Sequence, residues 1–355
     1  MRLPHPYRWA LGLVVALVAA LAIGVAVARP SAGGSPGSAT SSLLVPASER
    51  QPVPDFTGLS GWVNSPPLHE SQLRGNVVLI DFWTFSCVNC TRTIPHLRTL
   101  DDTYRSAGLV VVGVHSPEFD FEKDPANVAA AVRRLGVTWP VAIDSGMATW
   151  NAFGNQYWPA EYLVDRQGKV AYFHPGEGDY GTTEKAIVQL LGGAATPVPA
   201  VAGGPAPGSD TTPELYAGSL RGSLGDGETY GAQGARVDFP DRGAPAARDR
   251  ITLAGPWVDH AEYLEAAGPG HVRLRFHASD LYVVGGSASG SPLAVRVNLD
   301  GAPVPAALRG PDLTATGLSV SSSDLRHVLT GVSAGDHVVD LTVPAGFQLY
   351  TFTFG

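Results

Sequence analysis

The middle of the chain alternates short apolar runs with longer amphipathic stretches. Runs with the length and composition of buried strands lie at 77–82, 109–114, 141–143, 160–164 and 169–173. Stretches with the spacing of helices lie between or after them, at 87–105, 127–135 and 184–191. Strands and helices that interleave in this way favour an α/β sheet with helices on both faces.

The last third of the chain has an apolar period of two. In 271–276, Val272, Leu274 and Phe276 alternate with two arginines, as a half-buried antiparallel strand requires. Comparable runs recur at 293–299, 337–343 and 349–354, and glycine, proline and aspartate residues separate them. Many short strands without helices predict an all-β sandwich of the jelly-roll kind.

Low-complexity segments separate these blocks. A Ser/Gly/Ala/Pro-rich segment follows the N-terminal apolar run, and an Ala/Pro/Gly stretch divides the α/β block from the β block. Such compositions are typical of linkers. The expected organisation is an apolar segment at 1–28, a flexible linker at 29–51, the α/β domain at 52–192, a second linker at 193–212 and the β-sandwich at 213–355.

The N-terminal run predicts export. Ala10–Ala28 contains no charged residue, and as a helix it would be about 28 Å long, close to the ~30 Å hydrocarbon core of a bilayer. Arg2 and Arg8 precede it, which predicts a cytoplasmic N-terminus and an extracytoplasmic remainder. Its length favours a retained single-pass anchor in the cell membrane. The alternative is a signal peptide cleaved after Ala28, because Ala26-Val27-Ala28 has the small-x-small form of a cleavage site.

Composition and charge exclude one class of function. The 355 residues, 44% apolar and 16% charged, are enough for two folded domains. The net charge is -8, only three residues are lysine, and no basic cluster is present. A nucleic-acid partner is therefore not expected.

The two cysteines of the chain carry the candidate chemistry. Cys87 and Cys90 enclose Val88-Asn89 where the strand at 77–82 gives way to a helix. Two cysteines three positions apart across the first helical turn can form a disulfide, and the helix N-terminus favours the thiolate of the first. We therefore expect Cys87 to be the exposed nucleophile and Cys90 the buried resolving thiol. Apart from this redox-active disulfide, no cofactor is expected.

Two other interpretations of the cysteine pair are weaker. A structural zinc site needs two further cysteine or histidine ligands, and the sequence offers none at a suitable spacing. No metal is therefore expected. A bystander pair of buried thiols is the plainer alternative, but the junction of strand and helix is the setting of redox-active pairs.

The sequence around these cysteines resembles the thioredoxin superfamily, in particular its membrane-tethered TlpA/ResA branch. Val78–Trp83 followed by Cys87–Cys90 is similar to the active-site strand and helix of thioredoxins, and Trp158–Asp165 is similar to the strand that begins with the family's cis-proline. The resemblance implies that Pro159 faces the cysteines. It also implies that the backbone of Trp158 pairs with an extended substrate peptide.

The resemblance assigns roles to two side chains of the first strand as well. Asp81 matches the buried acid of thioredoxins, which accepts or relays the proton of the resolving thiol. Trp83 is expected to join Trp158 among the substrate contacts. His115 and Glu118, in contrast, are expected to be structural residues of a loop.

A closer likeness is to the soluble part of DipZ-type proteins, in which a thioredoxin-like domain precedes a carbohydrate-binding-module-like jelly roll. The similar segments are 83–90, 113–119, 212–218 and 350–355. Protein thiols and disulfides are the implied substrates. A single helix cannot carry electrons across a membrane, so a separate CcdA-like donor is the expected partner if the protein is a reductant. Val88-Asn89 replaces the Gly-Pro of thioredoxin, which leaves oxidant and reductant both open.

A thiol peroxidase is one alternative function. The spacing of Thr84 and Cys87 also fits the Thr-x-x-Cys of peroxiredoxins. Ile80 stands where that motif has a proline, and a resolving cysteine one turn away is more typical of dithiol exchange.

A glycan-binding module with a passenger thioredoxin-like domain is the other alternative. Trp257, Tyr263, Tyr282 and Tyr350 could stack on a glycan ligand, although scattered aromatic residues more often fill a sandwich core. Several acidic and histidine residues could contact calcium or sugar but lack a ligand spacing, namely Asp259-His260, Asp280 and Asp336-His337.

Overall fold

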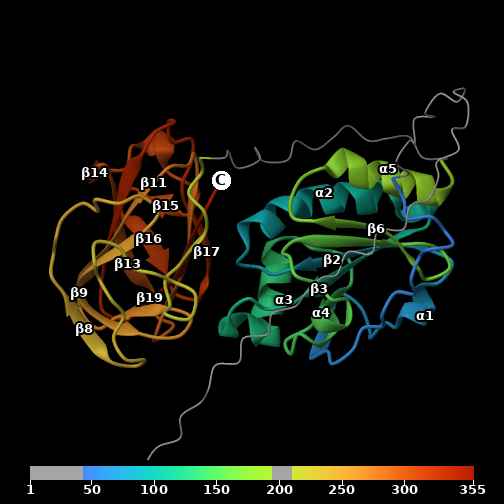
Figure 1. The fold of residues 1–355 in the computed structure, drawn as a ribbon, viewed down its shortest axis with the longest axis horizontal. Helices are drawn as coiled ribbons and strands as arrows, with labels where there is room; N and C mark the ends of the chain where they lie inside the picture. Colours follow the sequence, from blue (N-terminus) through green and yellow to red (C-terminus); the bar gives the residue numbers. More distant parts are fainter. Residues whose placement is uncertain (1–42, 194–209) are drawn as a thin grey trace, which may run out of the picture. The chain divides into compact units, whose positions relative to one another are not determined.

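The computed structural model describes residues 43–193 and 210–355. The predicted membrane anchor at 1–28 and most of both predicted linkers lie outside the described residues. Among the helices in the described part of the chain, none is long and apolar enough to cross a bilayer. The two folded parts, an α/β domain and a β domain, are described in turn (Figure 1).

A six-stranded mixed sheet forms the centre of the α/β domain, in the order β1-β4-β3-β2-β5-β6. Strands β2, β3 and β4 are parallel, and the other neighbours pair antiparallel. The strands are β1 (Gly61–Val63), β2 (Val77–Trp83), β3 (Leu109–His115), β4 (Val141–Ile143), β5 (Ala160–Val164) and β6 (Val170–Pro175). Their apolar runs are continuous because both faces of this sheet are covered.

Helices cover both faces of the sheet, as the sequence predicts. Leu79 and Trp83 of β2 pack with α2, α3 and α5, whereas the alternating Ile80 and Phe82 pack in a second core with α4. Helices α2 and α5 run along one face (Figure 1). The helices are α1 (Glu70–Leu73), α2 (Val88–Tyr104), α3 (Pro125–Arg134), α4 (Ala148–Ala152) and α5 (Tyr180–Leu191).

The α/β domain begins before residue 52. Leu44 is 5% exposed and belongs to the core that contains α2. The backbone N–H of Val45 donates to the carbonyl of Ala171 at 2.9 Å, and Arg50 forms an ion pair with Asp165 at 2.9 Å. Residues 43–51, which the sequence assigns to the flexible linker, are therefore held against the domain by an apolar side chain and two polar contacts.

The β domain consists, within residues 210–355, of thirteen strands in antiparallel ladders. The alternating burial of β11 confirms the period-two pattern seen in its sequence. The strands are β7 (Leu215–Tyr216), β8 (Arg236–Phe239), β9 (Ile251–Asp259), β10 (Leu264–Ala266), β11 (Gly270–Phe276), β12 (Leu281–Ser287), β13 (Leu293–Leu299), β14 (Ala302–Pro303), β15 (Leu313–Thr314), β16 (Gly317–Val320), β17 (Asp324–Leu329), β18 (His337–Val343) and β19 (Phe347–Phe354).

Strand β9 joins the two layers of the β domain. Its first half pairs with β11, and its second half pairs with β10 and β8. At the change of partner, Gly255 has φ +87°, and a Cβ there would lie 2.7 Å from the carbonyl oxygen of Pro269. Only glycine fits this bend. The two layers enclose one core that includes Trp257, Phe276 and Phe352, which makes this part a β-sandwich-like domain.

Candidate active site

The two cysteines lie at the N-terminus of α2. Strand β2 ends at Trp83, the loop 84–87 follows, and the helix begins at Val88. Cys87 is the N-cap residue, and its Sγ accepts a hydrogen bond from the Cys90 N–H at 3.2 Å. A thiolate at this position faces the unpaired N–H groups of the first turn and the positive end of the helix dipole. Cys87 is half-buried and Cys90 is buried.

Cys90 is held in a protonated form by its surroundings. The side chain is 1% exposed. Burial raises the pKa of the Cys90 thiol well above its usual value, the adjacent Cys87 sulfur raises it further, and the charge of Asp81 adds to the effect. A hydrogen bond from the Thr84 backbone acts in the opposite direction. The pair is therefore asymmetric, with one partly exposed cysteine and one buried thiol that needs a base.

Asp81 is a buried acid on the same face of the sheet as the core around Cys90. Its side chain is 2% exposed, and Oδ1 has no hydrogen-bond partner among the residues that the structure describes. Burial raises the pKa of Asp81 well above its usual value, and the nearby Glu161 raises it further. A carboxyl group with a raised pKa can accept and return a proton at higher pH than an exposed aspartate.

A second buried acid holds the loop in front of Cys87. Glu122, in the 3₁₀ turn Asp120–Lys123, accepts hydrogen bonds from the Ser86 hydroxyl at 2.6 Å and from the Ser86 N–H at 3.2 Å. Its other oxygen accepts the N–H groups of Glu118 and Phe119 at 2.6 and 3.0 Å. Burial raises the pKa of Glu122, and the hydrogen bonds that it accepts act in the opposite direction.

His115 lies at the end of β3 and not in a loop as the sequence suggested. It is fully buried, its Nε2 is 3.3 Å from Thr84 Oγ1, and its ring stacks on Phe85 with centroids 5.4 Å apart. Burial lowers the pKa of His115 to about 3, so the imidazole is neutral. The Thr84 hydroxyl, which a peroxiredoxin-like site would use near its cysteine, is engaged with this imidazole.

The strand that begins at Ala160 carries the second part of the site. The Trp158–Pro159 peptide bond is cis, in agreement with the resemblance. The indole Nε1 of Trp158 donates to the Ser116 carbonyl at 3.0 Å, and its ring lies 4.2 Å from that of Trp150. Trp158 and Cys87 are both partly buried and pack against the hydrophobic core that includes α2. These contacts fix the backbone that precedes Pro159.

Trp83 is not on the substrate-facing surface. Its side chain is 2% exposed, and its ring packs edge-on against His115 with centroids 5.2 Å apart. A buried indole cannot contact a protein substrate. We therefore assign Trp83 to the core below the dithiol, because the last residue of β2 points into the sheet face that α2 covers.

Sequence reasoning missed two buried acids, Glu122 and Glu161. Glu161 lies in β5 directly opposite Asp81 and is 1% exposed. Its signal in the sequence is the one that marks Asp81, namely a single carboxyl inside an apolar strand. Glu122 has no such signal, because it stands in the charged segment 118–124.

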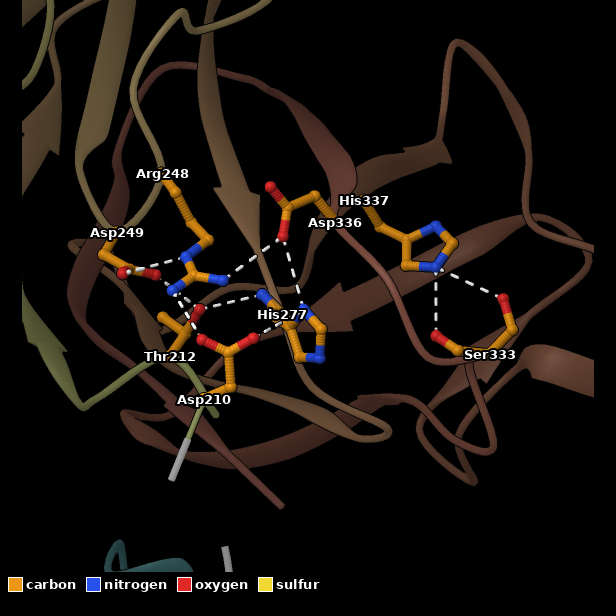
Figure 2. Close-up of polar contacts among 8 residues, drawn as sticks. All are labelled: Asp210, Thr212, Arg248, Asp249, His277, Ser333, Asp336 and His337. Carbon is orange, nitrogen blue, oxygen red and sulfur yellow. Dashed lines mark hydrogen bonds and ion pairs between the residues drawn. The ribbon is translucent and has the colours of Figure 1, made fainter. Parts of the chain in front are cut away.

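Arg248 is the centre of a polar cluster in the β domain (Figure 2). Its guanidinium lies 3.0, 3.3 and 3.4 Å from carboxylate oxygens of Asp210, Asp249 and Asp336. Asp336 is also 3.3 Å from His277 Nδ1. These charged groups satisfy one another and attach the beginning of the domain to its strands.

Two of the other candidate calcium or sugar ligands, Asp280 and His337, also have partners within the β domain, whereas Asp259 Oδ1 is buried without a hydrogen-bond partner among the described residues. Asp280 Oδ1 lies 2.9 Å from His327 Nε2, and His337 Nδ1 lies 2.7 Å from Asp300 Oδ2. Across residues 43–193 and 210–355, no three His, Cys, Asp or Glu side chains are grouped as a metal site would need.

Of the four aromatic residues considered as a sugar platform, Trp257 is the one that belongs to the core of the β-sandwich. Trp257 is 1% exposed, and its Nε1 donates to a backbone carbonyl of its own strand at 3.0 Å. Tyr263 and Tyr282 each stack on a histidine ring, with centroids 4.3 and 4.1 Å apart. Tyr350 is 6% exposed. The burial of Trp257 supports the interpretation that it fills the sandwich, whereas Tyr263, Tyr282 and Tyr350 lie outside that core.

A central sheet of this order, a Cys-x-x-Cys pair at the start of the helix after β2 and a cis-proline before β5 together define a thioredoxin-fold protein. Comparison with known proteins agrees. Residues 48–191 match the redoxin family, and residues 212–355 match the family described as thioredoxin like C-terminal domain. The chain belongs to the thioredoxin superfamily.

Three relatives illustrate this membership. The chain is 37% identical to protein DipZ of Mycobacterium tuberculosis over 316 residues, which are 85% of this chain and 43% of DipZ. It is 32% identical to the thiol-disulfide oxidoreductase YkuV of Bacillus subtilis over 40% of this chain and 95% of YkuV. It is 28% identical to the thiol-disulfide oxidoreductase ResA of Halalkalibacterium halodurans over 34% of this chain and 63% of ResA. The chain spans less than half the length of the DipZ protein that it matches.

Proposed function

We propose that the protein is an extracytoplasmic, membrane-anchored thiol–disulfide oxidoreductase that exchanges disulfides with other proteins through Cys87 and Cys90. The observation that carries the proposal is the geometry of the N-cap. Cys87 is partly exposed and its sulfur accepts the N–H of Cys90 at 3.2 Å, whereas Cys90 is buried. Such asymmetry separates a nucleophile from a resolving thiol.

The reaction has two sulfur-transfer steps. In the first, the Cys87 thiolate attacks one sulfur of a substrate disulfide, and the other substrate sulfur leaves as a thiolate that takes up a proton. In the second, Cys90 gives its proton to Asp81 and attacks Cys87 Sγ, which forms the Cys87–Cys90 disulfide and releases the substrate. Two electrons pass from the protein dithiol to the substrate. The same steps in reverse oxidise a substrate dithiol.

The environment of each group fits its step. The helix N-terminus stabilises a negative sulfur at Cys87. Asp81, a buried acid with a raised pKa, suits the exchange of a proton with Cys90. The backbone of Trp158 before the cis Pro159 would pair with an extended substrate strand.

The setting of this chemistry is part of the proposal. The apolar run at 10–28 supports a single-pass anchor, with a secreted form after cleavage at Ala28 as the alternative. The β domain would be a carbohydrate-binding-module-like jelly roll with a glycan as its ligand. A CcdA-like membrane protein would supply electrons if the protein is a reductant.

Trapping tests the proposal. In the full chain, Cys90→Ser should accumulate a mixed disulfide with insulin or another disulfide protein, whereas Cys87→Ser should form none. Non-reducing electrophoresis and mass spectrometry detect the adduct. Equal exchange by the wild type and Cys87→Ser would refute the proposal. Turnover of hydrogen peroxide faster than disulfide exchange would favour the peroxidase alternative instead.

Three further measurements address the direction of exchange, the cellular setting and the glycan-binding alternative. The equilibrium potential of the Cys87–Cys90 couple should lie near about -270 mV for a thioredoxin-like reductant or near about -120 mV for a DsbA-like oxidant. Protease added to intact spheroplasts should cleave both domains if they are extracytoplasmic. Binding to a glycan array that persists in Cys87→Ser would support the glycan-binding alternative.

A further inference from the structure

Three titratable side chains form a row across the sheet of the α/β domain. Asp81 of β2 lies directly opposite Glu161 of β5, and Glu161 lies directly opposite His174 of β6. Directly opposite residues in antiparallel strands project from the same face, with Cβ atoms about 5 Å apart. The alternation of β2 and β5 places this row on the face that α2 and α5 cover.

The row runs from two buried acids to a more exposed histidine. Asp81 and Glu161 are 2% and 1% exposed, whereas His174 is half-buried on β6, the last strand of the sheet. Asp81 is too buried to exchange a proton directly with water. The row therefore places three proton-binding groups at successive strands, from the core around Cys90 to the sheet edge.

Both ends of the row have an unsatisfied buried atom. Within the described residues, Asp81 Oδ1 and His174 Nε2 have no hydrogen-bond partner. Glu161, between them, accepts one hydrogen bond from Thr183 Oγ1 at 2.9 Å. Unpartnered buried polar atoms reduce stability, and at these two positions the unpartnered atom can bind or release a proton.

Other ionisable groups face the row from the elements packed on it. On α2, Arg92 is paired with Glu177 at 2.7 Å and His96 stacks on Tyr180 with centroids 4.2 Å apart. Among the described residues, the ionisable neighbours on these elements include Cys87, Cys90, Arg92 and His96 of α2 and its N-cap, Tyr172 of β6, Glu177 and Asp179 of the following loop, and Tyr180 and Glu184 of α5.

We infer that Asp81, Glu161 and His174 form a path that carries the proton of the resolving thiol between Cys90 and solvent. The inference rests on the proposed function, because only thiol exchange requires this proton to move. Asp81 is the group next to the reacting thiol. Glu161 and His174 act through it as relay residues.

The proton balance of the path is complete. When the protein dithiol is oxidised, the Cys90 thiol gives its proton to the Asp81 carboxylate as the Cys90 sulfur bonds to Cys87 and the substrate sulfur leaves. Asp81 passes the proton to Glu161, Glu161 passes it to His174, and His174 releases it to water. Electrons move only between sulfur atoms. When the protein disulfide is reduced, one proton travels inward along the same groups.

The acid–base properties of the middle residue are compatible with this role. Burial raises the pKa of Glu161 to about 7. A carboxyl group of this pKa gives up and takes up a proton near neutral pH with little free-energy cost in either direction. An ordinary glutamate would remain ionised and would hold protons too weakly to relay them.

A two-phase thiol reaction of the full chain tests the path. Excess Ellman's reagent releases one coloured thiolate when Cys87 attacks and a second when Cys90 resolves the adduct. We expect His174→Gln to slow the second phase several-fold without changing the first, and added imidazole to restore it. Glu161→Gln should also slow the second phase. In a plot of the second-phase rate against pH, the rise on the acid side should move to lower pH by about one unit, because a negative charge near Asp81 is removed.

Matched controls and contrary outcomes make the test decisive. His69→Gln replaces an exposed histidine and Asp101→Asn replaces a buried acid near the far end of α2, so both phases should match the wild type. The path would be overturned if the second phase were as fast in His174→Gln and Glu161→Gln as in the wild type. It would also be overturned if imidazole did not restore the rate of a slow His174→Gln protein. Either result would leave the proposed function intact. A wild-type protein that lacks a second phase would overturn both.

Discussion

Ser86 Oγ donates a hydrogen bond of 2.6 Å to Glu122, and this contact fixes the residue that precedes the nucleophile. Glu122 is fully buried, and its carboxylate also accepts three backbone N–H groups. Cys87 caps α2, so the orientation of the preceding peptide determines where its sulfur lies relative to the first helical turn. Glu122 thus holds the residue that precedes Cys87.

Glu122→Gln is expected to lower both stability and the rate of the first sulfur-transfer step. In the variant, an amide nitrogen would face backbone N–H donors that a carboxylate oxygen accepts in the wild type. The lost hydrogen bonds would lower the free energy of unfolding by about 2–3 kcal/mol. Urea unfolding and the first phase of the thiol reaction measure the two effects. Ser86→Ala, which removes only the hydroxyl contact, should cost about 1 kcal/mol. A Glu122→Gln protein as stable and as fast as the wild type would contradict this role.

Asp81→Asn is expected to slow the resolving step by about 10²-fold or more and to spare the first step, because asparagine cannot take the proton of Cys90. Burial raises the pKa of Asp81, and the carboxylate is the base, so the wild-type resolving rate should rise with pH through that pKa. The variant should lose this rise. Single-turnover kinetics across pH measure it. Identical pH profiles for the two proteins would exclude Asp81 as the base.

The sequence predicted those parts of the fold and site that local patterns determine. The strands at Val141–Ile143, Ala160–Val164 and Leu293–Leu299 have the predicted bounds, because each is an apolar or alternating run between turn residues. Strand β1 was missed because it is a three-residue edge strand without a buried side chain. The bend at Gly255 was missed because it depends on the approach of another backbone segment.

The same distinction applies to the candidate site. Cys87, Cys90 and Asp81 lie within ten residues, where a motif can be read directly. Glu161 becomes part of the site through the register of β5 against β2, and His174 through that of β6 against β5. Such registers are set by tertiary pairing, which a single sequence does not specify.

Glu161 should make stability fall as pH rises. Burial raises its pKa to about 7 from 4.5. Between these values the folded state binds more protons than the unfolded state, so the free energy of unfolding decreases with pH, by about 3 kcal/mol in total at ~1.4 kcal/mol per pKa unit. Glu161→Gln does not ionise and should lack this decrease. Urea unfolding at a series of pH values measures it, and parallel curves for variant and wild type would contradict the assignment.

His115 should affect the pH dependence of stability in the opposite direction, lowering the free energy of unfolding as the pH becomes acid. Burial lowers its pKa to about 3 from 6.5, so below pH 6.5 the unfolded state binds a proton that the folded state does not. Stability should fall as pH decreases through this window, by up to about 5 kcal/mol. His96, whose pKa burial lowers to about 4, adds a loss of the same sign.

His115→Asn should therefore flatten, but not abolish, the acid limb of a plot of unfolding free energy against pH. The matched control is His69→Gln, because the side chain of His69 is 63% exposed and its replacement removes no buried imidazole. The control should keep the wild-type limb. An equally steep limb in His115→Asn would show that His115 does not resist protonation in the fold.

Trp257→Leu should destabilise the β domain as a core substitution. The indole is 1% exposed, it packs in the core that unites both layers, and its Nε1 donates to the Ala254 carbonyl at 3.0 Å. Replacement leaves a void and an unpaired carbonyl, at a cost of about 3 kcal/mol or more. Leu220→Ala is the matched control, because Leu220 is 70% exposed, and it should change stability by less than about 0.5 kcal/mol. Thermal unfolding of the full chain compares the two. A Trp257→Leu protein with wild-type stability would mean that this indole is available to a ligand and would reopen the sugar-platform interpretation.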